Sequence, residues 1–178
     1  MPINSRNNLN ISLSLFSPSK TGWPWSEQSK QLPKTMKNGK LWPKISIVTP
    51  SFNQVQFIEE TIRSVILQNY PNLEYIIIDG GSTDGSVEII KKYEKYLTYW
   101  VSEPDSGQSE AINKGWKIAT GDIIAWLNSD DMYMPYALST IASMYAANPD
   151  KIIFQGSCNN IDIEGNHLFT YPAQEMDS

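Results

Sequence analysis

Five short apolar runs alternate with segments in which apolar side chains recur at helical spacing. The runs predict buried strands at residues 45–49, 73–78, 98–101, 123–127 and 151–155. Ile58, Ile62, Val65 and Ile66 fall on one face of the first predicted helix, and similar stripes predict helices after the second, third and fourth strands. Strands that alternate with helices predict a mostly parallel sheet with helices on both faces. The pattern therefore predicts a Rossmann-like α/β domain over residues 44–178, with a hairpin around residues 162–165.

Residues 1–43 show no sustained period and are rich in Ser, Asn, Lys and Pro, which predicts an irregular N-terminal arm. The arm contains Trp23, Trp25 and Trp42, whose large rings are costly to leave in water. Two arrangements account for them. Either the arm lies over the domain and packs these rings against it, or the rings contact a partner or an acceptor.

The composition narrows the function classes. The chain has 178 residues and a formal net charge of −5, which makes it a poor candidate for nucleic-acid binding, because that needs Lys and Arg to neutralise phosphates. The single cysteine, Cys158, and the single histidine, His167, exclude an intrachain disulfide and a two-histidine metal site. There is no apolar run of the about 18–20 residues that a transmembrane segment needs, and no clear signal peptide. We therefore expect a cytoplasmic protein, with the inner face of the membrane as an alternative place.

Polar residues follow each of the first four predicted strands. In open α/β sheets, ligands bind beyond the carboxyl ends of the strands, so these four segments should share one rim. Three of them carry carboxylates without compensating Lys or Arg, which favours a divalent cation, because clustered carboxylates repel one another. The segments are residues 49–53, 79–81, 102–108 and 128–131.

The acidic residues at this rim each have two possible roles, one in ligand binding and one in the local structure. Asp130 and Asp131 offer the oxygen ligands that Mg²⁺ or Mn²⁺ prefers, or they cap the helix that follows. Asp79 could accept a hydrogen bond from the N–H of a base or from a ribose hydroxyl, or it satisfies the backbone of the Gly80–Gly81 turn. Neither a GxGxxG sequence nor a P-loop is present, so a dinucleotide or ATP-type phosphate cradle is not supported.

Four segments in order resemble the donor-binding part of glycosyltransferase family 2, the inverting enzymes of GT-A fold. They are IVTPSFNQ, YIIIDGGSTDGSVEII, YWVSEPDSGQSEAINKGWKIATGD and AWLNSDDMYMP, and together they span residues 45–135. The resemblance implies transfer of a hexose from a nucleoside-diphosphate donor, UDP foremost, to the hydroxyl of a glycan or lipid-linked acceptor in bacterial polysaccharide synthesis.

The resemblance also implies roles for individual residues. Four residues of the first turn would hold the nucleotide base, namely Thr49, Pro50, Ser51 and Asn53. Asp79 would contact the base or the ribose. Asp105, Gln108 and Asn113 would lie near the diphosphate-sugar, Asp130 would bind Mn²⁺ or Mg²⁺, and Asp131 would assist it.

Two departures from the family pattern change the expectation. Asn128 stands at the first position of the DxD-like motif, where the pattern has Asp. The family's general base is an acidic residue well downstream of that motif, and none of Asp162, Glu164, Glu175 and Asp177 has the expected context. We therefore expect a C-terminally truncated donor-binding domain whose base lies beyond Ser178.

Four other functions compete with this interpretation. A phosphoacceptor receiver domain needs an acidic pair after the first strand, and a sugar-nucleotide pyrophosphorylase needs a Gly-rich basic loop there, whereas the chain has Thr49-Pro50-Ser51. A non-catalytic sugar-nucleotide-binding fragment would bind nucleotide without transfer. An interaction domain that recruits partners through the tryptophans of the arm would bind no nucleotide.

Overall fold

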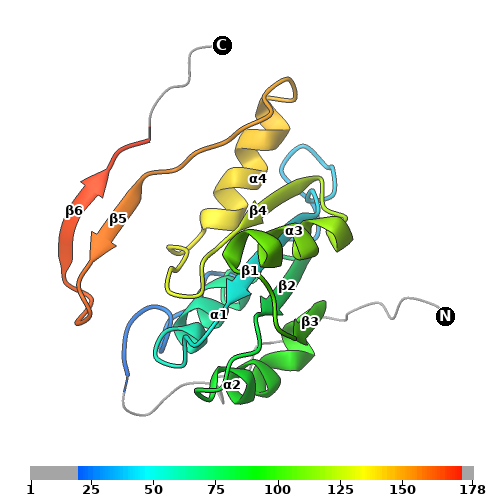
Figure 1. Ribbon diagram of the computed structural model, residues 1–178. Coiled ribbons are helices and arrows are strands. Elements are labelled where there is room, and N and C mark those ends of the chain that lie inside the picture. Colours follow the sequence, from blue (N-terminus) through cyan, green and yellow to red (C-terminus); the bar gives the residue numbers. More distant parts are fainter. Residues whose placement is uncertain (1–19, 174–178) are drawn as a thin grey trace. The chain divides into compact units, whose positions relative to one another are not determined.

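A computed structural model describes residues 20–173 of the chain (Figure 1). The described part divides into two compact units, with the boundary between Ala142 and Ser143. The first unit contains a four-stranded sheet in the order β3-β2-β1-β4. All three neighbouring strand pairs are parallel. The strands are β1 (Ile45–Ser51), β2 (Leu73–Asp79), β3 (Tyr99–Ser102) and β4 (Ile123–Trp126).

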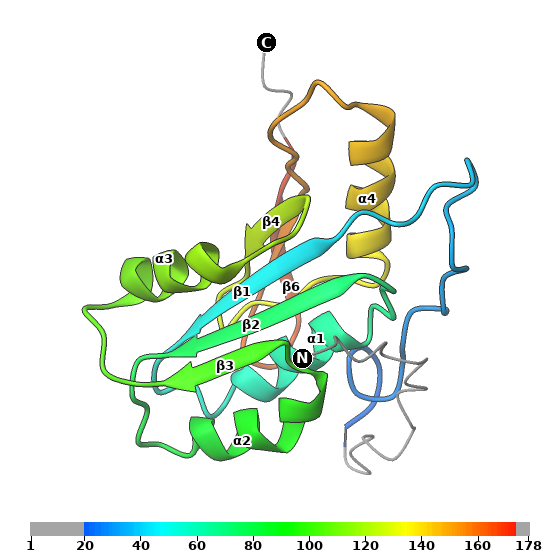
Figure 2. The same ribbon diagram turned by 90° about the vertical axis from the view of Figure 1, so that its right-hand side faces the viewer.

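Helices cover both faces of this sheet. α1 (Ile58–Ile66) and α2 (Ser86–Tyr93), which continues into the short 3₁₀ turn η2 (Glu94–Tyr96), lie on one face, and α3 (Gln108–Ile118) lies on the other (Figure 2). α4 (Ala137–Ala147) begins in the first unit. Each of the first three helices connects two parallel strands. The predicted α/β fold with a parallel, doubly covered sheet is thus confirmed.

The two central strands, β1 and β2, are buried along almost their whole length because helices cover both faces of the sheet there. On the α1 side, Ile45, Ile47 and Ile77 are at most 1% exposed and join the larger core. On the α3 side, Val48 and Ile76 form a smaller core with Ile78 and Ala111. Alternate residues of one strand therefore enter different cores, so β1 and β2 have no row of side chains that faces solvent.

Gly115 of α3 fits directly over Val48. A Cβ at this position would overlap the Val48 side chain, which is fully buried. The glycine therefore lets the helix approach the sheet closely, and this sets the depth at which the first turn of α3 meets the carboxyl ends of the strands.

The second unit, from Ser143 onward, contains the predicted hairpin. β5 (Cys158–Ile161) pairs with β6 (His167–Tyr171) in antiparallel fashion. The Asp162 carboxylate holds the turn by accepting hydrogen bonds from the backbone N–H groups of Glu164 and Asn166. A hydrogen bond from the Asn166 side chain, together with these backbone bonds, holds the pKa of Asp162 below its ordinary value.

The strand predicted at residues 151–155 is wrong. That segment has no regular structure, and Ile152 and Ile153 are 95% and 65% exposed. A short apolar run becomes a strand only where its backbone groups find a partner. In the described part of the second unit, the paired segments are β5 and β6, which follow the predicted run.

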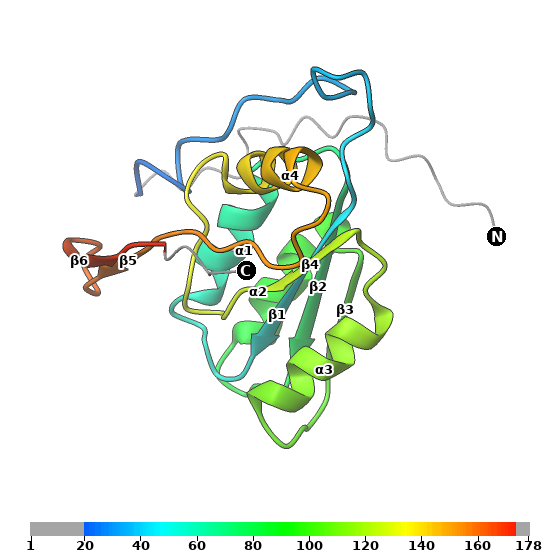
Figure 3. The same cartoon turned by 90° about the horizontal axis from the view of Figure 1, so that it is seen from above.

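The arm, as far as it is described (residues 20–43), belongs to the first unit and packs its tryptophans against the rest of it. Trp25 and Trp42 are 7% and 9% exposed, and the indole N–H of Trp23 donates to the carbonyl of Tyr133 at 2.8 Å. Seen from above, this blue segment runs on the α1 side of the sheet (Figure 3). Of the two arrangements considered for these rings, the structure has the docked one.

A buried carboxylate ties the amino ends of three strands together, opposite the rim where ligands are expected. Glu74 of β2 accepts hydrogen bonds from Lys44, Ser46 and Thr120. Burial alone would raise the pKa of Glu74, but these bonds lower it from its ordinary 4.5 to about 2. The ionised side chain therefore stabilises the folded state.

This contribution is complete above the unfolded pKa and disappears as the pH falls from about 4.5 toward 2. We expect Glu74→Gln to lower the free energy of unfolding at pH 7 by up to about 3 kcal/mol. The deficit should shrink when urea unfolding is repeated at pH 3. Glu103→Gln is the matched control, because Glu103 pairs with Lys114 at the surface and should cost less than about 1 kcal/mol. A deficit independent of pH would contradict this account.

Candidate functional site

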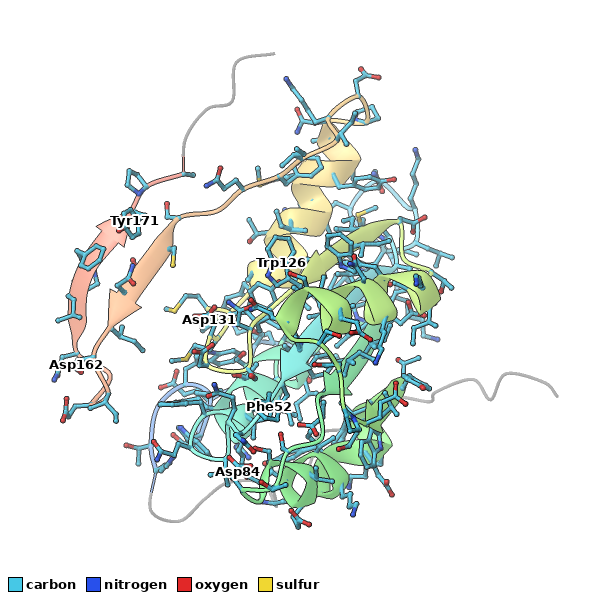
Figure 4. The ribbon with its side chains drawn as sticks, in the orientation of Figure 1. Phe52, Asp84, Trp126, Asp131, Asp162 and Tyr171 are labelled. Carbon is cyan, nitrogen blue, oxygen red and sulfur yellow. The ribbon has the colours of Figure 1, made fainter. Side chains whose placement is uncertain are left out.

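The loops that follow the parallel strands come together at the carboxyl edge of the sheet, as the sequence predicts. Phe52, Asp84 and Asp131 mark the loops after β1, β2 and β4 (Figure 4). The ring of Phe52 is 60% exposed, so a large apolar surface is open to solvent next to polar loops.

Side chains lock the loop after β1 to the loop after β2. Asn53 adopts a left-handed conformation with φ of 52°, which Asn tolerates better than most residues. Its side-chain oxygen accepts from the N–H of Thr83 at 3.0 Å, and its own N–H donates to Ser82 at 2.8 Å. Asp84 accepts from the N–H of Val55 at 2.9 Å. The two loops therefore form one preorganised wall.

Asp79 organises the turn at the end of β2. Its carboxylate is fully buried and accepts hydrogen bonds from the N–H of Gly81, from the N–H and hydroxyl of Ser82, and from the hydroxyl of Ser102. This is the turn role, one of the two interpretations of Asp79. A contact from Asp79 to a base or ribose stays a prediction.

A cavity of about 370 Å³ lies between the four loops. Five predicted residues line it: Pro50, Ser51, Asp105, Gln108 and Asp130. The other predicted residues are not among its lining. Thr49 is fully buried, with its hydroxyl 3.1 Å from that of Tyr75, and Asn113 lies exposed on α3.

The charges of the cavity lining are unbalanced. Asp105 and Asp130 line it, and none of the described lining residues is Lys, Arg or His. The hydroxyl of Ser51 also borders the cavity, and within residues 20–173 it is the one buried side-chain polar atom without a hydrogen-bond partner. Because buried polar groups are nearly always paired in native proteins, with protein groups or with water, this hydroxyl is available to hydrogen-bond a ligand or a water in the cavity.

A hydrogen-bonded chain links the start of α3 to the acidic turn, which we define as residues 128–131. Gln108 donates through Nε2 to the side-chain oxygen of Asn128 at 2.7 Å, and Asn128 donates through Nδ2 to Asp131 at 3.1 Å. Asp131 is thereby occupied within the turn, while Asp130 lines the cavity. Partial burial and then the charge of Asp130 raise the pKa of Asp131, against the hydrogen bond from Asn128.

Sequence reasoning missed several residues of the lining. The sequence analysis treated Asn128 only as a departure from the DxD-like motif, although its side chain connects α3 to the acidic turn. Gly80 brings the backbone close to Asp105, because a Cβ there would lie 3.0 Å from a carboxylate oxygen of Asp105. The glycine pair after β2 was the available signal. Phe52 and Ser129 gave no signal of their own.

The donor set fits a hard divalent cation in part. In residues 20–173 no three His, Cys, Asp or Glu side chains converge on one point, so the chain does not build a closed cage there. Mg²⁺ and Mn²⁺ are commonly held by one or two carboxylates, with substrate phosphates and waters completing the shell. Asp130 and Asp105, which both line the cavity, offer the one or two carboxylates that such an open site needs.

Comparison with known proteins gives evidence on the family of this chain that is independent of the site geometry. The family described as Glycosyl transferase family 2 matches residues 46–170, which is well over half of the chain. The chain belongs to glycosyl transferase family 2. Its α/β architecture is the GT-A fold of that family's solved structures, so both the family resemblance and the fold expected from the sequence are confirmed.

Bacterial glycosyltransferases resemble this chain over about half of its length. An uncharacterised glycosyltransferase of Mycobacterium tuberculosis is 40% identical over 92 residues, which are 51% of this chain and 35% of the relative. A putative teichuronic acid biosynthesis glycosyltransferase of Bacillus subtilis, TuaG, is 41% identical over 96 residues, 51% of this chain and 37% of TuaG. The chain thus matches about a third of the length of these relatives.

Solved structures show the same architecture. Staphylococcus aureus TarS 1–349 in complex with UDP has a TM-score of 0.56 at 28% identity, over 60% of this chain and 33% of that one. A mannosyltransferase from Pyrobaculum calidifontis in complex with GDP-Man and Mn²⁺ has a TM-score of 0.54 at 24% identity, over 75% of this chain and 39% of that one, and shares the fold. Within residues 20–173 of this chain, no helix is long and apolar enough to cross a membrane.

Proposed function

We propose that this chain is the donor-binding part of an inverting glycosyltransferase. It would bind a UDP-sugar in the cavity between the four loops, with a divalent cation shared between Asp130 and the diphosphate. The observation that carries the proposal is the lining itself, which has two carboxylates and no basic side chain. A diphosphate would be repelled from such a cavity unless a cation came with it.

The chain's own residues would divide the work of binding. The rigid turn after β1 would hold the base, with Ser51 offering its unpartnered hydroxyl and Phe52 an exposed ring. Asp79 would act through the turn that it organises or by contact with the ribose. Asp105 and Gln108 border the cavity on the α3 side and would contact the sugar-phosphate.

Asp130 would hold the cation, and Asp131, its neighbour in the turn, would assist it. Mn²⁺ or Mg²⁺ would offset the charge that develops on the leaving diphosphate. The choice of uridine is supported by TarS, a structure in complex with UDP, at 28% identity. A role in bacterial polysaccharide synthesis, with a glycan or lipid-linked acceptor, is supported by the likeness to the putative teichuronic acid enzyme.

Inverting transfer needs a base that takes the proton of the acceptor hydroxyl as this oxygen attacks the anomeric carbon. Asp162 is engaged in the hairpin turn, which leaves it poorly suited to that task. Glu175 and Asp177 lie outside the described residues. Because the matched part covers about a third of the relatives, the second candidate function is donor binding without transfer, with the base and acceptor site supplied by further sequence.

Calorimetric titration of the chain with UDP, GDP and dTDP, each with and without Mn²⁺, tests the proposal. We expect UDP to bind in the presence of Mn²⁺ and to show no measurable heat in EDTA, with GDP and dTDP weaker. Release of sugar from a UDP-sugar would then separate transfer or hydrolysis from binding alone. Equal binding with and without Mn²⁺, or the absence of binding by all three nucleotides, would contradict the proposed cation-dependent donor site.

A further inference from the structure

The loop that leaves the acidic turn, residues 131–136, is held by one face of α1. Thr61 donates its hydroxyl to the carbonyl of Asp131 at 2.7 Å. Ser64 accepts from the N–H of Tyr133 at 3.1 Å. Gln68, just beyond the helix, donates to the carbonyl of Met134 at 3.0 Å. These three side chains are spaced by three and four residues, as one helical face requires, and each is at most 2% exposed.

The N-terminal arm adds two contacts to the same loop. The indole N–H of Trp23 donates to the carbonyl of Tyr133 at 2.8 Å. The hydroxyl of Ser29 accepts from the N–H of Tyr136 at 3.1 Å. Ser29 is 1% exposed, and its backbone N–H donates to the carbonyl of Leu67 at 2.9 Å. Residues 133–136 of the loop are therefore hydrogen-bonded both to the α1 segment and to the arm.

The arm is itself fixed to α1. Arg63, which is 1% exposed, donates to the carbonyls of Pro24 and Trp25 at 3.0 and 3.1 Å. The indole N–H of Trp25 donates to Glu60 at 3.0 Å. α1 thus holds both the arm and the loop. Because Trp23 and Ser29 of the arm also contact the loop directly, a shift of the arm would move the loop.

We propose that the arm is a brace for the acidic turn, in which Trp23 and Ser29 are positioning residues that keep Asp130 facing the cavity. Asp131 belongs both to the turn, where its N–H donates to the carbonyl of Asn128 at 3.1 Å, and to the braced loop. Movement of the loop would therefore rotate the carboxylates. Two adjacent carboxylates repel one another, so a preset geometry lowers the cost of gathering them around a cation. The inference rests on the proposed function and deepens it.

Trp23→Phe tests the brace, because it removes the indole N–H and keeps an aromatic ring. Trp42→Phe is the matched control in the same arm, since its indole N–H donates to Pro33 at 2.9 Å, within the arm and not to the loop. The first readout is amide hydrogen exchange of the unliganded full chain. We expect exchange over residues 131–136 to be about fivefold faster in Trp23→Phe than in the wild type, and unchanged in the control. Ser29→Ala should behave like Trp23→Phe.

The second readout is the Mn²⁺ concentration that gives half-maximal UDP binding. A residue with a merely structural role would lower the unfolding temperature without moving this midpoint. We expect Trp23→Phe to raise the midpoint about fivefold and Trp42→Phe to leave it unchanged. Equal exchange over residues 131–136 in the two variants, or an unchanged Mn²⁺ midpoint in Trp23→Phe, overturns the brace. If the wild type binds no nucleotide, the proposed function fails, and the exchange measurement alone decides whether the arm braces the loop.

Discussion

Asp130→Asn is expected to weaken UDP binding in Mn²⁺ by about 100-fold or more, while circular dichroism and thermal unfolding stay as in the wild type. Asp130 is exposed and lines the cavity, so the substitution removes a charge without opening a core. Even residues that act one shell away from a metal typically contribute about 10–100-fold to affinity or activity. A direct ligand should therefore matter at least as much.

Two further variants make this result specific. Asp150→Asn removes the same charge at an exposed position outside the cavity lining and should leave UDP binding unchanged. Asp131→Asn should weaken binding less than Asp130→Asn, because the Asp131 side chain is hydrogen-bonded to Asn128 within the turn. A loss in Asp150→Asn as large as in Asp130→Asn would indicate a general charge effect and contradict the assignment of Asp130.

Arg63→Met is expected to lower the free energy of unfolding by about 3–5 kcal/mol, which is a large fraction of a domain's total. The guanidinium is buried, donates to two arm carbonyls and to the hydroxyl of Tyr93 at 3.1 Å, and lies over the ring of Trp25. Methionine fills similar space but leaves the buried carbonyls of Pro24 and Trp25 without these donors, at about 1–3 kcal/mol each.

Urea unfolding followed by far-UV circular dichroism measures this loss. Lys92→Met is the control, because Lys92 pairs with Glu59, which also accepts a hydrogen bond from the hydroxyl of Tyr93. Lys92 is 57% exposed, so its loss should cost less than about 1 kcal/mol. Arg63→Lys should fall between the two, since an ammonium group cannot reach the carbonyls in the forked geometry of a guanidinium. An Arg63→Met variant within 1 kcal/mol of the wild type would contradict the role given to Arg63 in fixing the arm.

The fold could be predicted from the sequence wherever the local pattern of apolar residues is enough to determine a helix or a strand. β1, β2 and the helix between them follow from apolar runs and helical spacing, because both faces of that part of the sheet are buried. Residues 151–155 have an equally apolar pattern but no strand. Whether such a run pairs depends on a partner backbone, which periodicity does not contain. The hairpin, in contrast, carries its own turn residues from Asp162 to Gly165.

The candidate site was predictable to the level of its loops. Strand ends and clustered carboxylates pointed to the rim, and Asp105 and Asp130 do line one cavity there. The directions of individual side chains were not predictable. Asp79 and Asp131 turn into hydrogen bonds with their own loops, and the bonds of Trp23 and Ser29 to the loop after the acidic turn join residues more than 100 positions apart. Long-range hydrogen bonds of this kind leave no local pattern in the sequence.

The central claim is that a divalent cation binds at Asp130 together with a nucleoside diphosphate. Nuclear magnetic resonance of the ¹⁵N-labelled chain with UDP and substoichiometric Mn²⁺ tests it directly, because the paramagnetic ion broadens the amide signals nearest to it. We predict that residues 105–108 and 128–131 broaden first. Residues near Glu74, about 20 Å away at the amino ends of the strands, should stay sharp. Broadening centred at that opposite end, or spread evenly over the surface carboxylates, would contradict the claim.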